Sequence, residues 1–192
     1  MLCGSHHSGS TNAVVLAMVA DRLVTAGVAV EPIDVSIDVP AFRPEAVADP
    51  PPVVRRLRTI FEDADGVVFS VPEYAGGVPG WVKNITDWMV GSGSLYRRPV
   101  AVLSAATSGG GGAIEGLART LTWHGAFVVT TCSVPAPLTM VRDGAITDAE
   151  VLARLHDSAD TLLAVLQGDI DASPHAAVVL TPLGIEPGDR FI

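Results

Sequence analysis

The chain has 192 residues, of which 48% are hydrophobic and 17% are charged, and its formal net charge is −9 at pH 7. This length suits one domain with its own apolar core. Lys83 is the single lysine, and the densest basic cluster, Arg55, Arg56 and Arg58, is interpreted as a solvated helix face. Binding to nucleic acid or to an anionic membrane depends on clustered positive charge. We therefore expect neither as a partner.

Two cysteines, Cys3 and Cys132, are too few for a disulfide framework and show no metal-ligand spacing. We interpret both as small buried hydrophobic residues in a reducing compartment. The chain does not open with a basic region and a long apolar run, and no apolar stretch approaches the roughly 20 residues of a bilayer span. The sequence predicts a cytoplasmic protein without a metal site.

Apolar strands alternate with helix-length segments through most of the chain. Strands are expected at residues 1–3, 29–33, 66–71, 100–104 and 126–131. Helices are expected at residues 11–26, 52–62, 80–90, 113–124 and 148–166. This alternation predicts a doubly wound, five-stranded parallel α/β sheet with helices on both faces. We expect the flavodoxin-like strand order 2-1-3-4-5, with a ligand site at the switch between the first and third strands.

Three segments fall outside this alternation. Residues 34–52 are rich in proline and are expected to form a surface connection, and residues 133–144 are expected to form a long loop. Residues 1–167 are predicted to form the domain, and residues 168–192 a tail that is a dimer clasp, an extra edge strand or a loosely ordered terminus. Only three residues precede Gly4, so either the first strand begins upstream or the sheet has a weak centre.

The loop after the first strand is rich in hydrogen-bonding groups. It reads Gly4-Ser5-His6-His7-Ser8-Gly9-Ser10-Thr11-Asn12 and leads directly into the first helix. A helix N-terminus with free backbone N–H groups and hydroxyls suits an anion. An ordinary helix cap needs only one such residue, whereas this loop has five within eight positions. The surplus indicates a phosphate site.

A second loop follows the third predicted strand. Residues 66–71 are almost continuously apolar, as in a strand that is covered on both faces, and Pro72 ends the ladder because it lacks a donor. Residues 72–80 form a Pro/Gly-rich loop at the carboxyl end of this strand, which is where open α/β sheets bind ligands. Glycines allow the main chain to approach a flat ring closely. The segment is typical of a backbone platform for a planar ligand.

The two loops together resemble those of the NADPH-dependent FMN reductase family, flavodoxin-like flavoenzymes that include quinone, azo-dye and chromate reductases. The family's first motif, G-S-x-R-x-x-S-x-N, aligns with residues 4–12, and its second, P-E-Y-N-G-S-x-P-G-x-x-K-N-x-x-D-W, with residues 72–88. The resemblance extends over most of residues 1–166. It implies bound FMN, NADPH or NADH as the reductant, and a homodimer or homotetramer that completes the pocket.

The resemblance also implies cofactor-binding residues. Those expected around the phosphate are Ser5, His7, Ser10, Thr11 and Asn12. Those expected at the edge of the flavin ring are Pro72, Glu73, Tyr74, Ala75, Gly76 and Gly77. Those expected on the other side of the flavin are Ser104, Thr107, Ser108, Gly109 and Gly110.

Three of these positions depart from the family pattern: His7 replaces Arg, Ala75 replaces Asn and Gly77 replaces Ser. Histidine lacks the permanent charge and the bidentate fork of arginine, so weaker FMN binding is expected. Imidazole gains its charge as the pH falls, so FMN should bind more tightly at lower pH if His7 faces the phosphate. His6 is expected to face solvent.

By this resemblance, the chain passes hydride from NAD(P)H through flavin N5 to a small acceptor, which is a quinone, an azo compound, a metal oxyanion or free flavin. Hydride transfer needs no general acid, so no catalytic side chain is assigned and Glu73 is not expected to be one. The alternatives are a flavodoxin-like electron carrier or flavin-binding module without NAD(P)H activity, and an interaction protein that has lost its flavin. No G-x-G-x-x-G follows the first strand, and no G-K-[ST] occurs in the chain.

Overall fold

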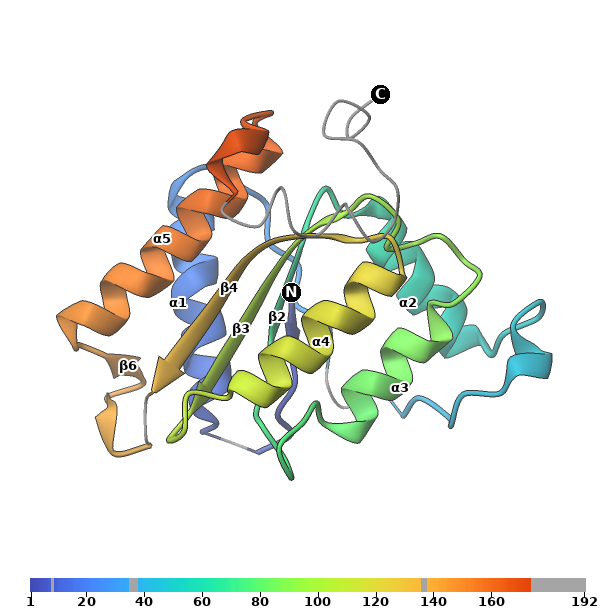
Figure 1. Ribbon diagram of the computed structural model, residues 1–192, viewed down its shortest axis with the longest axis horizontal. Helices are drawn as coiled ribbons and strands as arrows, with labels where there is room; N and C mark the ends of the chain where they lie inside the picture. The colour runs from blue at the N-terminus through green and yellow to red at the C-terminus, as the bar shows by residue number, and fades with distance from the viewer. Residues whose placement is uncertain (8, 35–37, 136–137, 174–192) are drawn as a thin grey trace.

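The computed structural model describes residues 1–7, 9–34, 38–135 and 138–173. A parallel sheet forms the centre, and helices cover both of its faces (Figure 1). The strands of this sheet, in spatial order, are β1 (Leu2–Cys3), β2 (Val67–Ser70), β3 (Pro99–Ala106) and β4 (Phe127–Pro135). The predicted parallel α/β class is confirmed. The predictions for residues 174–192 lie outside the described residues.

Five α-helices occur close to their predicted positions. They are α1 (Thr11–Thr25), α2 (Pro52–Asp63), α3 (Gly80–Trp88), α4 (Gly111–Trp123) and α5 (Ala149–Leu166). Short 3-10 helices occur at Pro44–Ala46, Leu138–Met140 and Ile170–Ala172. Helices α1 and α5 lie on one face of the sheet, and α2, α3 and α4 lie on the other (Figure 1). Every residue of β2 is buried, because both of its faces are covered.

The predicted second strand, residues 29–33, is reduced to one point of contact. Ile33 forms an isolated parallel bridge with Leu2, and its N–H donates to the carbonyl of Met1 at 2.7 Å. Pro32 has no N–H to add to a ladder, and β1 offers only two residues for pairing. Among the described residues the main sheet therefore has four strands, and the predicted five-strand order is not reached.

The predicted loop over residues 133–144 also contains regular structure. β4 continues to Pro135, and β5 (Val141–Arg142) pairs antiparallel with β6 (Ala145–Ile146). Asp143 and Gly144 connect these two strands with φ angles of 50° and 79°. Asp-Gly is favoured in two-residue hairpin turns because both positions require positive φ. This dipeptide is the sequence signal that would have predicted the hairpin.

Side chains of α3 hold the proline-rich connection in place. The amide oxygen of Asn84 accepts from the Phe42 N–H at 2.8 Å, and its amide nitrogen donates to the Pro40 carbonyl at 3.0 Å. The indole of Trp88 donates to the same carbonyl at 2.7 Å, and Phe42 packs edge-on against its ring. Both side chains therefore have structural roles.

Arg58 differs from its two basic neighbours. Arg55 and Arg56 are exposed, but Arg58 is half-buried between α2 and the end of α3. Its Nε and Nη2 donate to the Trp88 carbonyl at 3.1 and 2.8 Å, and its Nη1 donates to the Val47 carbonyl at 3.2 Å. A cation at a helix C-terminus also complements the helix dipole. The interpretation of this cluster as a solvated face is therefore wrong for Arg58.

Replacing Arg58 with Met should lower the free energy of unfolding by about 1–3 kcal/mol, because three hydrogen bonds from a charged group are lost. The measurement is urea unfolding followed by circular dichroism. Arg56→Met is the matched control, since Arg56 is exposed on the same helix, and its effect should stay within about 0.5 kcal/mol. Equal effects of the two substitutions would contradict the structural role of Arg58.

Candidate functional site

Three loops meet at the carboxyl edge of the sheet. The first loop (residues 4–10) follows β1, the second loop (residues 71–79) follows β2, and the third loop (residues 107–110) follows β3. Because the three strands are parallel neighbours, their carboxyl ends lie at the same edge (Figure 1). The first and second loops are in direct contact, since a Cβ on Gly4 would lie 2.8 Å from the Val71 side chain.

The first loop is organised by its own hydroxyl groups. Ser10 is the N-cap of α1, and its Oγ accepts from the Asn12 N–H at 3.2 Å. The Ser5 Oγ accepts from the His7 N–H at 3.3 Å. Both serines are buried, Thr11 is half-buried and His7 is exposed. The loop therefore keeps the imidazole of His7 at the surface beside the N-terminus of α1.

Asn12 braces the sheet with its side chain. It is 3% exposed, and its amide nitrogen donates to the Ala105 carbonyl at 2.8 Å. Its amide oxygen accepts from the Ala105 N–H at 2.9 Å and from the Ser70 hydroxyl at 3.2 Å. The side-chain amide thus binds protein groups on β2 and β3. Asn12 supports the predicted phosphate loop by holding the start of α1 in place.

The second loop contains a tight turn. Tyr74 and Gly77 exchange two backbone hydrogen bonds of 3.0 Å, and Ala75 and Gly76 between them have φ angles of 51° and 75°. Such turns favour Asn at the first central position, and a Cβ in this conformation costs roughly 1–2 kcal/mol. Tyr74, Ala75 and Gly76 are exposed, whereas Pro72 is buried. The turn presents main chain and one phenol to solvent.

Glu73 connects the second loop to α4. Its Oε2 accepts from the backbone N–H of Gly112 at 2.7 Å and from that of Ala113 at 3.3 Å. Both donors belong to the first turn of α4. A Cβ on Gly112 would overlap the carbonyl oxygen of Gly76. The turn of the second loop therefore lies directly against the start of this helix.

The third loop is packed on small polar side chains. A Cβ on Gly110 would overlap the Ser104 hydroxyl, and Gly110 has a φ of 71°, so only glycine fits. The Ser133 hydroxyl donates to the Gly109 carbonyl at 2.8 Å. The Ser104 Oγ is fully buried and has no hydrogen-bond partner among the described residues. Thr107 and Ser108 are exposed.

Two aromatic contacts at this edge were not predicted from the sequence, although His6 is exposed as expected. The Trp81 indole donates to the Gly4 carbonyl at 3.1 Å and so ties α3 to the first loop. The exposed His6 ring stacks on Trp81 with centroids 4.4 Å apart. The sequence signal for the contact between Trp81 and Gly4 is a tryptophan at the second position of the helix that follows the second loop. No sequence pattern places His6 on Trp81.

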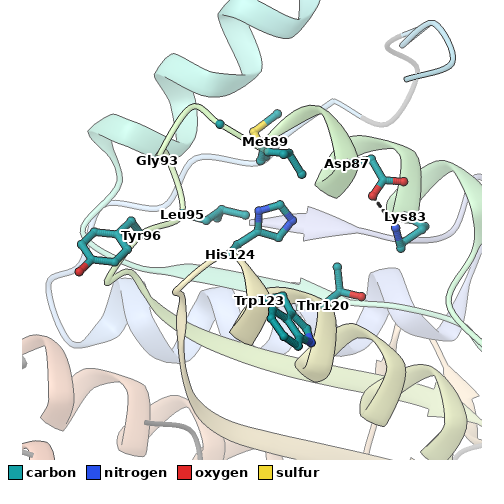
Figure 2. Close-up of a pocket in the computed structure, with 11 residues that line it drawn as sticks. Lys83, Asp87, Met89, Gly93, Leu95, Tyr96, Thr120, Trp123 and His124 are labelled. Carbon is teal, nitrogen blue, oxygen red and sulfur yellow. Dashed lines mark hydrogen bonds and ion pairs between the residues drawn. The ribbon is translucent and has the colours of Figure 1, made fainter. Parts of the chain in front are cut away.

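A pocket of about 520 Å³ lies at the other ends of α3 and α4 (Figure 2). Its lining includes Lys83, Asp87, Leu95, Thr120, Trp123 and His124. Lys83 and Asp87 form an ion pair. Burial lowers the pKa of His124, and the neighbouring Asp87 opposes this shift. The pocket is at the C-termini of both helices, whereas the three loops lie at their N-termini, so it is separate from the loop site.

Neither cysteine is activated as a nucleophile. Burial raises the pKa of Cys132 to about 11 and also raises the pKa of Cys3, so both remain protonated at neutral pH. In the described part of the chain, no cluster of His, Cys, Asp or Glu side chains suits a metal ion. No helix within those same ranges is long and apolar enough to cross a bilayer.

These features define an open parallel α/β protein whose loop site lies at the carboxyl edge of the central strands. The sequence model of one family, described as NADPH-dependent FMN reductase, matches residues 1–139. The chain belongs to this family, which confirms the resemblance of the two loop motifs.

Curated relatives carry related names. The chain is 32% identical to an NAD(P)H:quinone oxidoreductase of Solanum tuberosum over 115 residues, which are 58% of this chain and 59% of that protein. It is 36% identical to an NAD(P)H-dependent FMN reductase of Pseudomonas aeruginosa over 88 residues, which are 45% and 46% of the two chains. In both cases the match spans less than two thirds of the relative's own length.

Among solved structures, FerB from Paracoccus denitrificans, described as a flavoenzyme NAD(P)H:(acceptor) oxidoreductase, superimposes with a TM-score of 0.75. The alignment covers 86% of this chain and 94% of FerB at 23% identity. At this identity the similarity establishes the fold.

Two buried serines on neighbouring strands should respond differently to replacement with Ala. Ser104→Ala should leave the free energy of unfolding unchanged or raise it by up to about 1 kcal/mol, because the lost hydroxyl has no partner. Ser70→Ala should lower it by about 1–2 kcal/mol, because Ser70 donates to the Asn12 carbonyl at 2.9 Å. Urea unfolding without flavin measures both. A large loss for Ser104→Ala would show that its hydroxyl has a partner.

Proposed function

We propose that this protein is an FMN-dependent NAD(P)H oxidoreductase that passes hydride from NADPH or NADH to a small acceptor. The acceptor class is a quinone, an azo compound, a metal oxyanion or free flavin. The observation that carries the proposal is the meeting of three glycine- and hydroxyl-rich loops at one edge of the sheet, in a chain of the FMN reductase family. No side chain is assigned as catalytic.

The residues present fit a flavin at this edge. Gly77 and Gly111 have neither a positive φ nor any atom within 4 Å of an added Cβ, so the fold itself does not require glycine at these positions. Open space beside exposed backbone is what a flat ring needs for close approach. The buried hydroxyl of Ser104 beneath the third loop remains without a partner among the described residues. Both features support a ligand between the second and third loops.

Each loop has a distinct task in this proposal. Ser5 and Ser10 shape the first loop, and the N-terminus of α1 with His7 supplies positive potential for a phosphate. The backbone of residues 72–77 borders the edge of the ring, and residues 104–110 border its other side. Bound FMN would supply the redox chemistry of the site. The protein holds the ring and leaves one face accessible.

The decisive experiment measures NADPH and NADH oxidation by the purified protein with catalytic FMN and a quinone. Steady oxidation that saturates in both substrates supports the reductase. Flavin binding without oxidation supports the alternative of an electron carrier or flavin-binding module. No flavin binding at about 100 μM, where a weak interaction of about 5.5 kcal/mol would register, supports an interaction protein that has lost its cofactor.

Binding of FMN should be tighter at about pH 6 than at about pH 8, because a histidine beside a phosphate gains its charge in this range. His7→Arg should strengthen binding by about tenfold, since a bidentate charged donor replaces imidazole, and should remove the pH dependence. Flavin fluorescence titration measures both effects. His6→Gln is the matched control and should preserve the pH dependence, while a His7→Gln variant with the same pH dependence as the unmodified protein would rule out His7 as a phosphate ligand.

The domain, its location and its assembly are also proposals. Residues 1–167 form the reductase domain and residues 168–192 a tail. Helix α5 ends at Leu166, and Ser173 then contacts β4 through a hydroxyl that donates to the Val129 carbonyl at 2.7 Å. We place the protein in the cytoplasm, where its two free cysteines would stay reduced.

We propose that the subunits of a homodimer, or of a homotetramer built from it, contact each other beside the pocket at the C-termini of α3 and α4. Three large apolar side chains are exposed beside this pocket: Val90 by 45%, Tyr96 by 55% and Trp123 by 81%. Nearby charges include the ion pairs Lys83–Asp87 and Arg119–Glu115. Among the described residues no excess of negative charge gathers there, so two copies of a chain with net charge −9 can approach each other at this surface.

Trp123→Glu should convert the oligomer to a monomer, because a carboxylate would be buried without a partner in the interface. Light scattering coupled to gel filtration measures the mass. Val24→Glu is the matched control, since Val24 is an exposed apolar residue on α1, on the opposite face of the sheet, and this variant should keep the original mass. An unchanged mass for Trp123→Glu would exclude this surface as the interface.

A further inference from the structure

Helix α4 has no capping side chain of its own. Its N-cap is Gly110, which provides no side-chain acceptor. No other residue fits there, because a Cβ would overlap the Ser104 hydroxyl and the φ of 71° is left-handed. The first backbone N–H groups of a helix have no partner within the helix. Those of α4 therefore need an acceptor from outside the helix.

Glu73 supplies that acceptor from the second loop. Its Oε2 binds the N–H groups of Gly112 and Ala113, the second and third residues of the helix. A local N-cap side chain binds the same positions: Asp148 accepts from Glu150 and Val151 at the start of α5. Glu73, however, lies 39 residues before its donor Gly112. Its cap is therefore also a cross-link between the second loop and the start of α4.

Close backbone packing accompanies this cross-link. Neither Gly112 nor Gly116 has a positive φ, so the helix itself does not require glycine at these positions. A Cβ on Gly112 would overlap the Gly76 carbonyl, and a Cβ on Gly116 would lie 3.3 Å from the Val78 side chain. The second loop therefore lies along the first two turns of α4. Without the cross-link, only the packing of small groups would hold the two together.

We propose that Glu73 is a positioning residue whose carboxylate fixes the turn formed by residues 74–77 to the start of α4. The turn and the third loop are then held as one unit, and the width of the space between them is set. The consequence for flavin rests on the proposed function. The Oε2 of Glu73 is engaged by two N–H donors as an acceptor, which fits a positioning role and not proton donation.

The test compares Glu73→Ala with the double variant Glu73→Ala/Gly111→Asp by amide hydrogen exchange without flavin. Residue 111 is the first helical residue and has open space for a side chain. An aspartate there stabilises the helix N-terminus without reaching back to anchor the second loop. Glu73→Ala should accelerate exchange in residues 74–77 and in residues 111–114. The added aspartate should restore protection to residues 111–114 only.

Two further variants sharpen the comparison. Glu115→Ala removes an acidic side chain that pairs with Arg119 on the same helix, and it should leave exchange in residues 74–77 unchanged. Glu73→Gln keeps an acceptor oxygen without the charge, so it should restore part of the protection. Unchanged exchange at 74–77 in Glu73→Ala, or its full recovery in the double variant, would overturn the positioning role.

FMN binding and NADPH oxidation are measured separately from the hydrogen exchange. Glu73→Ala should weaken FMN binding by about tenfold, because the two segments that border the ring are then unlinked. Glu73→Gln should retain the pH profile of NADPH oxidation, and a lost limb of that profile would overturn the assignment in favour of an acid. If the unmodified protein binds no FMN, the proposed function fails, while the exchange measurement still decides the role of Glu73.

Discussion

The buried side chain of Asn12 is the interaction on which the site depends. β1 contributes only two residues to the sheet, so the start of α1 would be poorly fixed by strand pairing alone. The Asn12 amide replaces the missing contacts by binding both backbone groups of Ala105 on β3 and the Ser70 hydroxyl on β2. A buried amide without these partners would be destabilising. One side chain therefore joins the start of α1, where the first loop ends, to the strands that carry the second and third loops.

A second constraint is the near absence of side chains where the loops touch. Gly4 lies against Val71, Gly112 against Gly76 and Gly110 against Ser104. Close backbone approach leaves N–H and carbonyl groups that must find partners in a confined space. Glu73 and Ser133 meet this need with one carboxylate and one hydroxyl. Glu73 thus holds its own loop to α4, and Ser133 holds the third loop to β4.

The sequence predicted the helices and the parallel sheet because their apolar periodicity is local. It also predicted a strand at residues 29–33, which forms only one isolated bridge. The segment is apolar, but Pro32 and the short β1 prevent a ladder. The positions of the three loops followed from strand order. The partners of Asn12, Glu73 and Arg58 did not, because these contacts join segments 93, 39 and 30 residues apart. Such contacts depend on tertiary packing, which no local pattern contains.

The packing of the third loop also limits how the site can diversify. Gly110 cannot be replaced, because its backbone is left-handed and a Cβ would overlap Ser104. Gly112 cannot be replaced, because a Cβ would overlap the Gly76 carbonyl. The exposed side chains at the same edge, Tyr74, Thr107 and Ser108, have no comparable restriction from their surroundings. Substitutions that change the chemistry of this edge without disturbing its backbone are therefore best tolerated at these three positions. The scaffold separates residues that preserve the shape of the site from residues that are free to adjust its chemistry.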